Sequence, residues 1–267
     1  MYLAKGVCMN IPLFQVDAFT EEKYKGNPAA VCILNKWVKD EQLQKIAREN
    51  NLSETAFIVK KNDKFELRWF TPTSEIDLCG HATLAAAYVV FNHIESKLNR
   101  VKFYTKSGEL VVKKRNSLLT MDFPARPAKY CNYPERLNEA INIKPEEVLK
   151  ARDYLLIYDN EKQIKKINPD FNKLKKLDTV GIIVSSRGEK YDFVSRFFAP
   201  SIGVNEDPVT GSSHTTLIPY WAKRLKKSDM IAYQYSKRGG TLYCENHKNR
   251  VSIAGNAVIY LKGNIFI

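Results

Sequence analysis

The chain carries one short motif twice, about half its length apart. Residues 68–72 (Arg-Trp-Phe-Thr-Pro) are followed by residues 79–84 (Cys-Gly-His-Ala-Thr-Leu), and residues 196–200 (Arg-Phe-Phe-Ala-Pro) are followed by residues 210–214 (Thr-Gly-Ser-Ser-His). The copies lie about 130 residues apart, and similarity at a fixed spacing indicates a duplicated structural unit. In each copy a glycine precedes an apolar helical run, where free backbone N–H groups can bind an anion. Two such units that face each other would enclose a cleft with two polar walls, which favours an enzyme.

The chain is long enough for two domains of this repeated kind. Its 267 residues are 44% hydrophobic and 11% aromatic, which suits a globular protein with a substantial core. This length fits one large domain or two of about 130 residues, and the repeat favours two. No apolar stretch approaches the roughly 18 residues of a membrane span, and the first residues lack the apolar core of a secretory signal. We therefore expect a cytoplasmic protein without a membrane partner, with Met9 as an alternative start to Met1.

The cysteines do not form a disulfide or metal framework. They are odd in number, scattered and without a Cys-x-x-Cys pair: Cys8, Cys32, Cys79, Cys131 and Cys244. This pattern disfavours both disulfides and a zinc site. The sequence also contains no Walker loop and no Gly-x-Gly-x-x-Gly fingerprint. We therefore predict chemistry without a cofactor or metal, namely proton transfer by side chains.

The net charge of +13 raises the alternative of a nucleic-acid partner. The lysines are spread along the chain, however, and many alternate with apolar residues, as in residues 173–177 (Lys-Leu-Lys-Lys-Leu). This distribution is typical of a solvated surface. We expect no nucleic-acid partner, and the same positive field would favour an anionic substrate.

Short strands and one buried helix in each half account for most of the chain. Alternating apolar residues and turn signals predict a hairpin from residues 11–19 and 29–34, joined by a turn at residues 25–28, and further strands at 53–59, 64–70, 101–105, 109–114 and 117–124. In the second half the same signals predict strands at 154–158, 179–185, 193–198, 233–236, 240–244, 250–254 and 257–262. Helices are expected at 39–50 and 134–141, and buried apolar helices at 82–92 and 213–225. This pattern predicts an α+β fold of two similar domains, each a barrel-like sheet around a central helix.

Two carboxylates stand where proton transfer could occur. Glu54 immediately precedes an apolar strand, and a carboxylate at the mouth of a strand can act as a general base in a cleft. The alternative is that Ser53 and Glu54 only end the preceding helix. Asp207 precedes Pro208 and lies four residues before Gly211, in the second copy of the motif. Asx-Pro pairs are also common in simple turns, which is the alternative for Asp207.

The repeated glycines bring in the other candidates. Gly80 and Gly211 let a ligand approach the backbone closely, and the positive end of each helix dipole would favour a carboxylate or a developing enolate. His81 and His214 are candidate acids, bases or carboxylate partners, or else structural histidines. Cys79 is a candidate thiol base at a helix N-terminus, or else a buried structural cysteine.

Four blocks of the sequence resemble the phenazine-biosynthesis-like isomerase family, which is related in fold to diaminopimelate epimerase. They comprise residues 16–19 with 26–31, residues 53–57, residues 68–72 with 78–83, and residues 206–212. They occur in the family's order and span nearly the whole chain. The resemblance implies two pseudo-symmetric halves with the active site between them. We expect residues 1–126, completed by residues 257–267, to form an N-terminal barrel domain, and residues 127–256 to form a C-terminal one.

The resemblance also implies roles for the candidate residues. The glutamate that matches Glu54 is expected to move the proton, as base and then as acid. The aspartate that matches Asp207 lies across the cleft and positions the substrate or assists the transfer. The backbone at Gly80 and His81 and at Gly211 and Ser212 would bind the carboxylate or the amino-acid-like end of the substrate. The epimerase relatives use two opposed cysteines, whereas residues 207–211 offer no second thiol opposite Cys79.

These observations predict a cofactor-independent isomerase that moves a proton on a small carboxylate-bearing metabolite in a biosynthetic process. The family resemblance further suggests a homodimer. Two alternatives stay open. One is an amino-acid epimerase or racemase that uses Cys79 as a thiol base. The other is a non-catalytic basic protein that binds nucleic acid or a partner protein.

Overall fold

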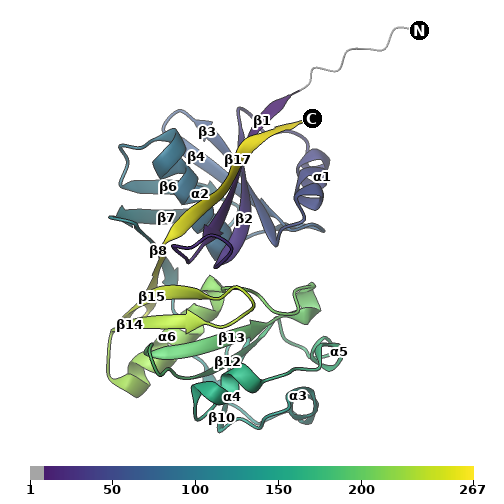
Figure 1. Ribbon diagram of the computed structural model, residues 1–267, viewed down its shortest axis with the longest axis vertical. Helices are drawn as coiled ribbons and strands as arrows, with labels where there is room; N and C mark the ends of the chain where they lie inside the picture. The colour runs from purple at the N-terminus through teal and green to yellow at the C-terminus, as the bar shows by residue number, and fades with distance from the viewer. Residues whose placement is uncertain (1–8) are drawn as a thin grey trace, which may run out of the picture.

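The computed structural model describes residues 9–267, which form two halves with the same order of strands (Figure 1). The expected alternative starts are Met1 and Met9, and only Met9 lies within the described residues. Cys8 lies outside them. The strands of the first half are β1 (Asn10–Ala18), β2 (Asn27–Leu34), β3 (Glu54–Lys61), β4 (Lys64–Phe70), β5 (Glu75–Ile76), β6 (Arg100–Thr105), β7 (Gly108–Arg115) and β8 (Leu118–Pro124). The later strands are β9 (Lys129–Tyr130), β10 (Glu147–Lys150), β11 (Tyr154–Ile157), β12 (Ile182–Arg187), β13 (Phe193–Phe198), β14 (Asp229–Gln234), β15 (Gly240–His247), β16 (Arg250–Gly255) and β17 (Ala257–Phe266).

The strands pair in the same way in both halves. In the first half β2 runs parallel to β3, β3 antiparallel to β4, and β4 parallel to β6, and β6, β7 and β8 follow as antiparallel neighbours. In the second half β11, β12, β13, β14, β15 and β16 repeat this series of parallel and antiparallel pairings. β1 and β10 hold equivalent places, each antiparallel to the strand that follows it. The duplication therefore extends from the short motif to the whole topology.

One strand pairing and two exchanged edge strands connect the two halves into one hydrogen-bonded sheet. β8 and β16 pair antiparallel across the boundary. β9, which follows β8, pairs with β10 of the second half, whereas β17, which follows β16, returns to the first half and pairs with β1. The C-terminal end of the chain accordingly lies beside β1 (Figure 1). Each half thus contains an edge strand that follows the last long strand of the other half.

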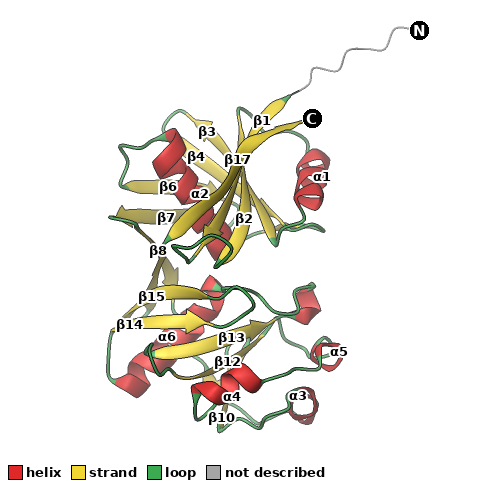
Figure 2. Ribbon diagram, viewed as in Figure 1, coloured by secondary structure: helices red, strands yellow, loops and turns green. Residues whose placement is uncertain are grey.

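One buried helix fills the interior of each half, and the other helices lie outside (Figure 2). The helices are α1 (Asp40–Asn50), α2 (Gly80–Val89) with its π-helical extension η1 (Val90–Ile94), α3 (Glu135–Ala140), α4 (Glu161–Lys166), α5 (Phe171–Leu174), the 3₁₀ turn η2 (Pro200–Ile202) and α6 (Gly211–Leu225). Eight of the ten residues of α2 are buried, as expected for a helix that is apolar on all sides. α6 contributes Leu217, Ile218 and Trp221 to the same hydrophobic core. α1 instead buries only one face, through Leu43 and Ile46.

The α+β class, the hairpin of β1 and β2 and the two central helices agree with the prediction from sequence. The strand expected at 233–236 was placed too late, because β14 begins at Asp229 and ends at Gln234. The expected turn at 25–28 is also wrong in part, since Asn27 already begins β2. The short elements β5, β9, β10, α4 and α5 were not predicted, because strands and helices of this length are stabilised by their neighbours and carry no periodic pattern. Among the helices of residues 9–267, none has the length and apolar character needed to cross a membrane.

Candidate active site

The two central helices begin at the same point, where the halves meet. Gly80 is the first residue of α2 and Gly211 the first residue of α6. A Cβ atom added to Gly80 would lie 3.6 Å from the Cα atom of Gly211, and one added to Gly211 would lie 3.7 Å from that of Gly80. These are ordinary contact distances, so glycine is not required here to avoid a clash. Both glycines line the cleft and place no side chain over the helix starts, where the two helix dipoles create a positive potential.

A cleft of about 710 Å³ opens over these two helix starts. This volume is typical of small-molecule binding sites. Of the residues predicted from sequence, those that line it are Glu54, Cys79, Gly80, His81, Asp207, Gly211 and Ser212. His214 is the predicted residue that does not line the cleft. The structure therefore brings the candidates of both halves into one site, with this single exception.

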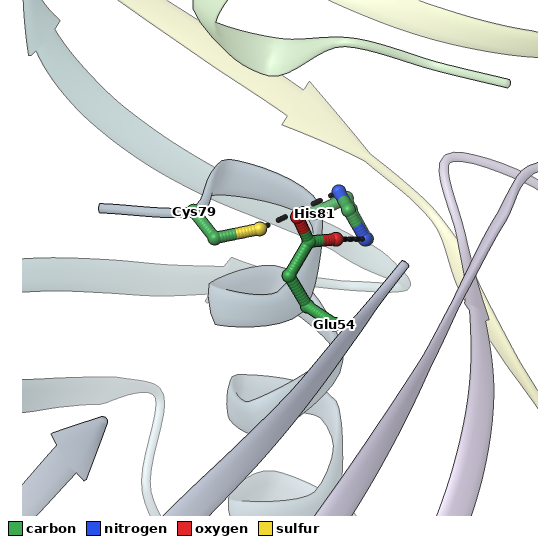
Figure 3. Close-up of side chains that lie close together, drawn as sticks. All are labelled: Glu54, Cys79 and His81. Carbon is green, nitrogen blue, oxygen red and sulfur yellow. Dashed lines mark hydrogen bonds and ion pairs between the residues drawn. The ribbon is translucent and has the colours of Figure 1, made fainter. Parts of the chain in front are cut away.

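Glu54, His81 and Cys79 form a contiguous cluster on the first-half wall (Figure 3). Nε2 of His81 lies 3.0 Å from Oε2 of Glu54, and the two side chains are only 7% and 14% exposed. Sγ of Cys79 lies 3.5 Å from Nδ1 of His81. Within residues 9–267, the buried atoms Glu54 Oε2 and His81 Nε2 have no further hydrogen-bond partner. The pair depends on this one contact, which leaves Glu54 able to turn to another partner.

Glu54 does not end the preceding helix. α1 ends at Asn50 and is followed by Asn51 in the left-handed conformation, with φ of 48°. Glu54 is the first residue of β3 and pairs with Ala29 of β2. Its side chain is therefore positioned by a strand inside the sheet, which excludes the helix-end interpretation.

The charges of this cluster depend on one another. Burial disfavours a charged His81, whereas its contacts with Cys79 and Glu54 raise the pKa of His81 well above its usual value. Burial first, and the Glu54 carboxylate second, raise the pKa of the Cys79 thiol. The thiol therefore stays protonated near neutral pH, and the Glu54 carboxylate is the charge that keeps His81 protonated.

Asp207 is held by both halves. Nδ2 of Asn27 donates to Asp207 Oδ1 at 2.8 Å and to the carbonyl oxygen of Val209 at 3.0 Å. The Thr210 hydroxyl donates to Asp207 Oδ2, so both carboxylate oxygens accept hydrogen bonds. Burial raises the pKa of Asp207 to about 6, although His81 and the hydrogen bond from Thr210 oppose this shift.

Two buried amides that the sequence analysis missed complete this network. Nδ2 of Asn27 also lies 3.2 Å from Nδ1 of His81, which places Asn27 between the first-half cluster and Asp207. Gln234 of β14 accepts a hydrogen bond from Thr210 N–H and donates one to the Asp207 carbonyl, both at 2.9 Å. Asn27 lies in one of the four blocks that resemble the family, and this position could have identified it as a candidate from sequence. Gln234 carries no such signal, because its role arises only from the pairing of β14 with β13.

His214 lies inside the second barrel, away from the cleft. Its side chain is fully buried, with Nδ1 2.8 Å from the carbonyl oxygen of Thr210. Its ring packs against Phe193 with centroids 5.9 Å apart. Burial lowers the pKa of His214 to about 4, so the ring is neutral at neutral pH. The two repeated histidines are therefore not equivalent, and His81 alone shares the cleft with Glu54.

The strand register identifies the counterpart of Glu54 in the second half. Phe70 and Phe198 occupy the same place in the repeated motif. Phe70 pairs with Thr55, which follows Glu54. Phe198 pairs with Ile182, which follows Gly181, so Gly181 corresponds to Glu54. A Cβ atom at Gly181 would lie 2.2 Å from the ring of Phe197. The aromatic ring therefore occupies the space that a side chain would need, and the second-half wall carries no carboxylate at this position.

The same cluster offers three potential metal ligands. One ligand atom each from Glu54, Cys79 and His81 lie within 4.8 Å of one another. A metal would require a Cys79 thiolate, whereas burial raises the pKa of this thiol. The arrangement favours a proton relay over a metal centre.

A sequence profile described as phenazine biosynthesis-like protein (PhzC-PhzF) matches residues 16–263. The chain belongs to this family. An uncharacterized isomerase of Pseudomonas aeruginosa is 50% identical over 259 residues, which cover 97% of this chain and 100% of the relative. The human phenazine biosynthesis-like domain-containing protein is 38% identical over 295 aligned positions, and the alignment covers 96% of this chain and 99% of the human one. These family members support the assignment of this chain as an isomerase.

Solved structures agree with this placement. A crystal structure of a PhzF family phenazine biosynthesis protein from Enterococcus faecalis has a TM-score of 0.95 and 47% identity, and covers 97% of this chain and 100% of its own. A hydroxyproline epimerase from Agrobacterium vitis has a TM-score of 0.62 and 8% identity, over 97% of this chain and 93% of its own, which shows a shared fold alone. The predicted fold, two pseudo-symmetric barrels around central helices as in the epimerases, is thereby confirmed.

Proposed function

We propose that this isomerase moves a proton on a small carboxylate-bearing metabolite without a cofactor, with Glu54 as general base and then general acid. The observation that carries the proposal is the position of Glu54, 3.0 Å from the buried His81 and beside the abutting starts of α2 and α6. A carboxylate base next to an anion-binding surface is what abstraction of a proton near a carboxylate requires. The family relationship also supports a homodimer as the assembly.

Different parts of the cleft would bind the substrate carboxylate and transfer the proton. The substrate carboxylate would accept hydrogen bonds from the N–H groups at Gly80 and Gly211 and from the Ser212 hydroxyl. Glu54 would take a proton from a carbon alpha or allylic to this carboxylate, and the electron pair of the broken C–H bond would spread into the adjacent unsaturated system. The protonated His81 would stabilise the negative charge. Glu54 would then return the proton to another carbon, so that no oxidant, reductant or leaving group is involved.

Asp207 would position the substrate and the first-half cluster. Both of its carboxylate oxygens accept hydrogen bonds, from Asn27 and Thr210, which limits its use as a second base. Asn27, which donates to Asp207, also lies 3.2 Å from Nδ1 of His81. A change at Asp207 is therefore expected to act through the geometry of the cleft.

Solvent exchange tests the proposed function directly. The protein, pretreated with EDTA, is incubated in D₂O with small unsaturated and amino carboxylic acids, one at a time, and followed by ¹H NMR. We expect at least one compound to incorporate deuterium at a carbon alpha or allylic to its carboxylate. Exchange that appears only after a metal ion or an organic cofactor is added would contradict the proposal.

The thiol-base alternative has one observation in its favour, the place of Cys79 within the cleft beside His81. Against it, the residue that corresponds to Cys79 at the start of α6 is Thr210, which is not a thiol. The second alternative, a non-catalytic basic protein, has no support from the isomerase relatives.

Replacing Cys79 with Ala should change kcat/KM by less than about tenfold, because a protonated thiol cannot act as the base. The rate is measured with the compound found by deuterium exchange. Cys32→Ala is the matched control, since Cys32 is also buried but lies in β2 outside the cleft. A loss of more than about a thousandfold for Cys79→Ala alone, on the scale expected for removal of a base, would establish the thiol-base mechanism instead.

A further inference from the structure

Two arginines line the cleft beside the beginning of α6. Arg152 lies in the turn between β10 and β11, and Arg126 follows β8. Nη2 of Arg152 donates to the Ser212 hydroxyl at 3.2 Å. The backbone N–H of Arg126 donates to the carbonyl oxygen of Thr215 at 2.9 Å. Both arginines are thus attached to the first residues of α6, and we call this pair the arginine wall.

Arg152 is fixed in place by a buried carboxylate. Its Nε lies 3.2 and 3.1 Å from the two oxygens of Asp153, and its Nη2 lies 2.7 Å from Oδ2. Asp153 is 1% exposed, whereas the side chain of Arg152 is 36% exposed. A buried carboxylate is costly unless it is paired, and here its partner is a guanidinium with one side open to the cleft. The pairing orients the guanidinium before a ligand binds, which lowers the entropic cost of binding.

Apart from His81 beside Glu54, the acidic and basic side chains of the cleft lie on different sides. The first-half wall carries the carboxylates of Glu54 and Asp77, and Asp207 lies near the boundary. The side of the cleft beside α6 carries Arg126, which follows β8, and Arg152, and α6 has no acidic residue in its first turn. An anionic group on the substrate would therefore be repelled from the base and attracted to the arginine wall. The substrate would be oriented by this difference.

We propose that the arginine wall binds a second anionic group, so that the substrate is a dicarboxylate or a carboxylate that also carries a phosphate. The proposal rests on the proposed function, in which the first carboxylate lies at the helix starts. The cleft of about 710 Å³ has room for two anionic groups joined by the reacting carbons. Guanidinium groups bind carboxylate and phosphate alike through paired hydrogen bonds, which a single positive charge on a surface does not provide.

Titration calorimetry with simple anions tests the arginine wall. Succinate and glutarate are compared with butyrate, and phosphoglycolate with glycolate and malonate. We expect the dianions to bind the native protein at least about tenfold more tightly than the monoanions of similar size, as one hydrogen-bonded charge contact would provide. Tighter binding of phosphoglycolate than of malonate would identify the second group as a phosphate, and the reverse order as a carboxylate.

Variants locate the preference within the cleft. Arg126→Gln should reduce the advantage of the dianions by about tenfold, with little change for butyrate. Arg152→Gln alone would leave Asp153 buried without a partner, so the double variant Arg152→Gln/Asp153→Asn is used, and the same loss is expected. Arg100→Gln removes an equal charge from an exposed position on β6 outside the cleft and is the control.

Equal binding of dianions and monoanions to the native protein would overturn the proposal. So would an advantage that falls no further in the cleft variants than in Arg100→Gln. Glu54→Gln separates this proposal from the proposed function, because it should retain the preference for dianions while it loses deuterium exchange. If it retains both, the assignment of the base fails and the arginine wall is supported.

Discussion

Replacing Glu54 with Gln should lower turnover by at least about a thousandfold and leave the fold intact. A positioned general base typically contributes a hundredfold to ten-thousandfold, and this carboxylate also keeps His81 protonated through the 3.0 Å contact. Glutamine has nearly the same shape and can still contact His81, but it cannot take a proton. The loss should appear in kcat with little change in KM, because binding of the substrate carboxylate depends on other groups.

The measurement is substrate-dependent deuterium incorporation together with turnover of the same compound. Glu109→Gln, in an exposed part of β7, is the control for the removal of one carboxylate. Thermal unfolding of both variants checks that the fold is retained. Full deuterium exchange by Glu54→Gln would refute Glu54 as the base, whatever the rate of the control.

The second large effect is expected in the pH dependence of stability when Asp207 is replaced with Asn. Burial raises the pKa of Asp207 to about 6 in the folded protein, from 3.8 for an ordinary aspartate. A difference of about two units corresponds to up to about 3 kcal/mol, at about 1.4 kcal/mol for each unit. The side chain is partly open to the cleft, so this figure is an upper bound.

The sign follows from proton binding. Below about pH 4 the carboxyl group is protonated in both the folded and the unfolded chain, and its contribution is at its most favourable. As the pH rises from about 4 to 6, the unfolded chain releases the proton first, and the free energy of unfolding falls. Above about pH 6 this contribution is lost. Asparagine keeps an oxygen for Asn27 and does not titrate, so Asp207→Asn should remove this part of the pH dependence.

Urea unfolding of the native protein and of Asp207→Asn at several pH values between 4 and 7 provides the measurement. The difference between the two free energies of unfolding should change by up to about 3 kcal/mol over this range. Asp63→Asn, in the exposed turn between β3 and β4, is the control. Parallel curves for the native protein and Asp207→Asn would show that burial does not perturb Asp207 as described.

The architecture could be predicted from sequence largely because the chain contains two copies of one structural unit. The repeated Arg-x-Phe strand and the glycine before an apolar run located β4, β13, α2 and α6, and a helix without a polar face has to lie in the interior. The hairpin of β1 and β2 followed from alternation. In contrast, the ends of β10 and β14 are set by the strands beside them. α4 begins with a capping box of Asn160 and Gln163, but the segment is rich in lysine and this helix was not predicted.

The candidate site was predicted in part for the same reason. Residues that belong to a motif, such as Glu54 and His81, could be named from sequence, and the structure places them together. Asn27, Gln234 and Arg152 could not, because each acts through a contact with a residue far away in the chain. Buried amides that join two distant segments leave no periodic trace, and they emerge only when strand pairing brings those segments together.

The absence of a side chain at Gly181 has a consequence for the stereochemistry of the proposed proton transfer. In a duplicated fold with a base on each wall, one carbon can lose its proton to one side and receive another from the opposite side, which inverts its configuration. Here the ring of Phe197 fills the space beside Gly181, the counterpart of Glu54 in the second half, and both oxygens of Asp207 accept hydrogen bonds. With Glu54 as the base, removal and return of the proton are suprafacial. In D₂O the product should carry its deuterium on a single prochiral face, the one turned toward Glu54 in the first half.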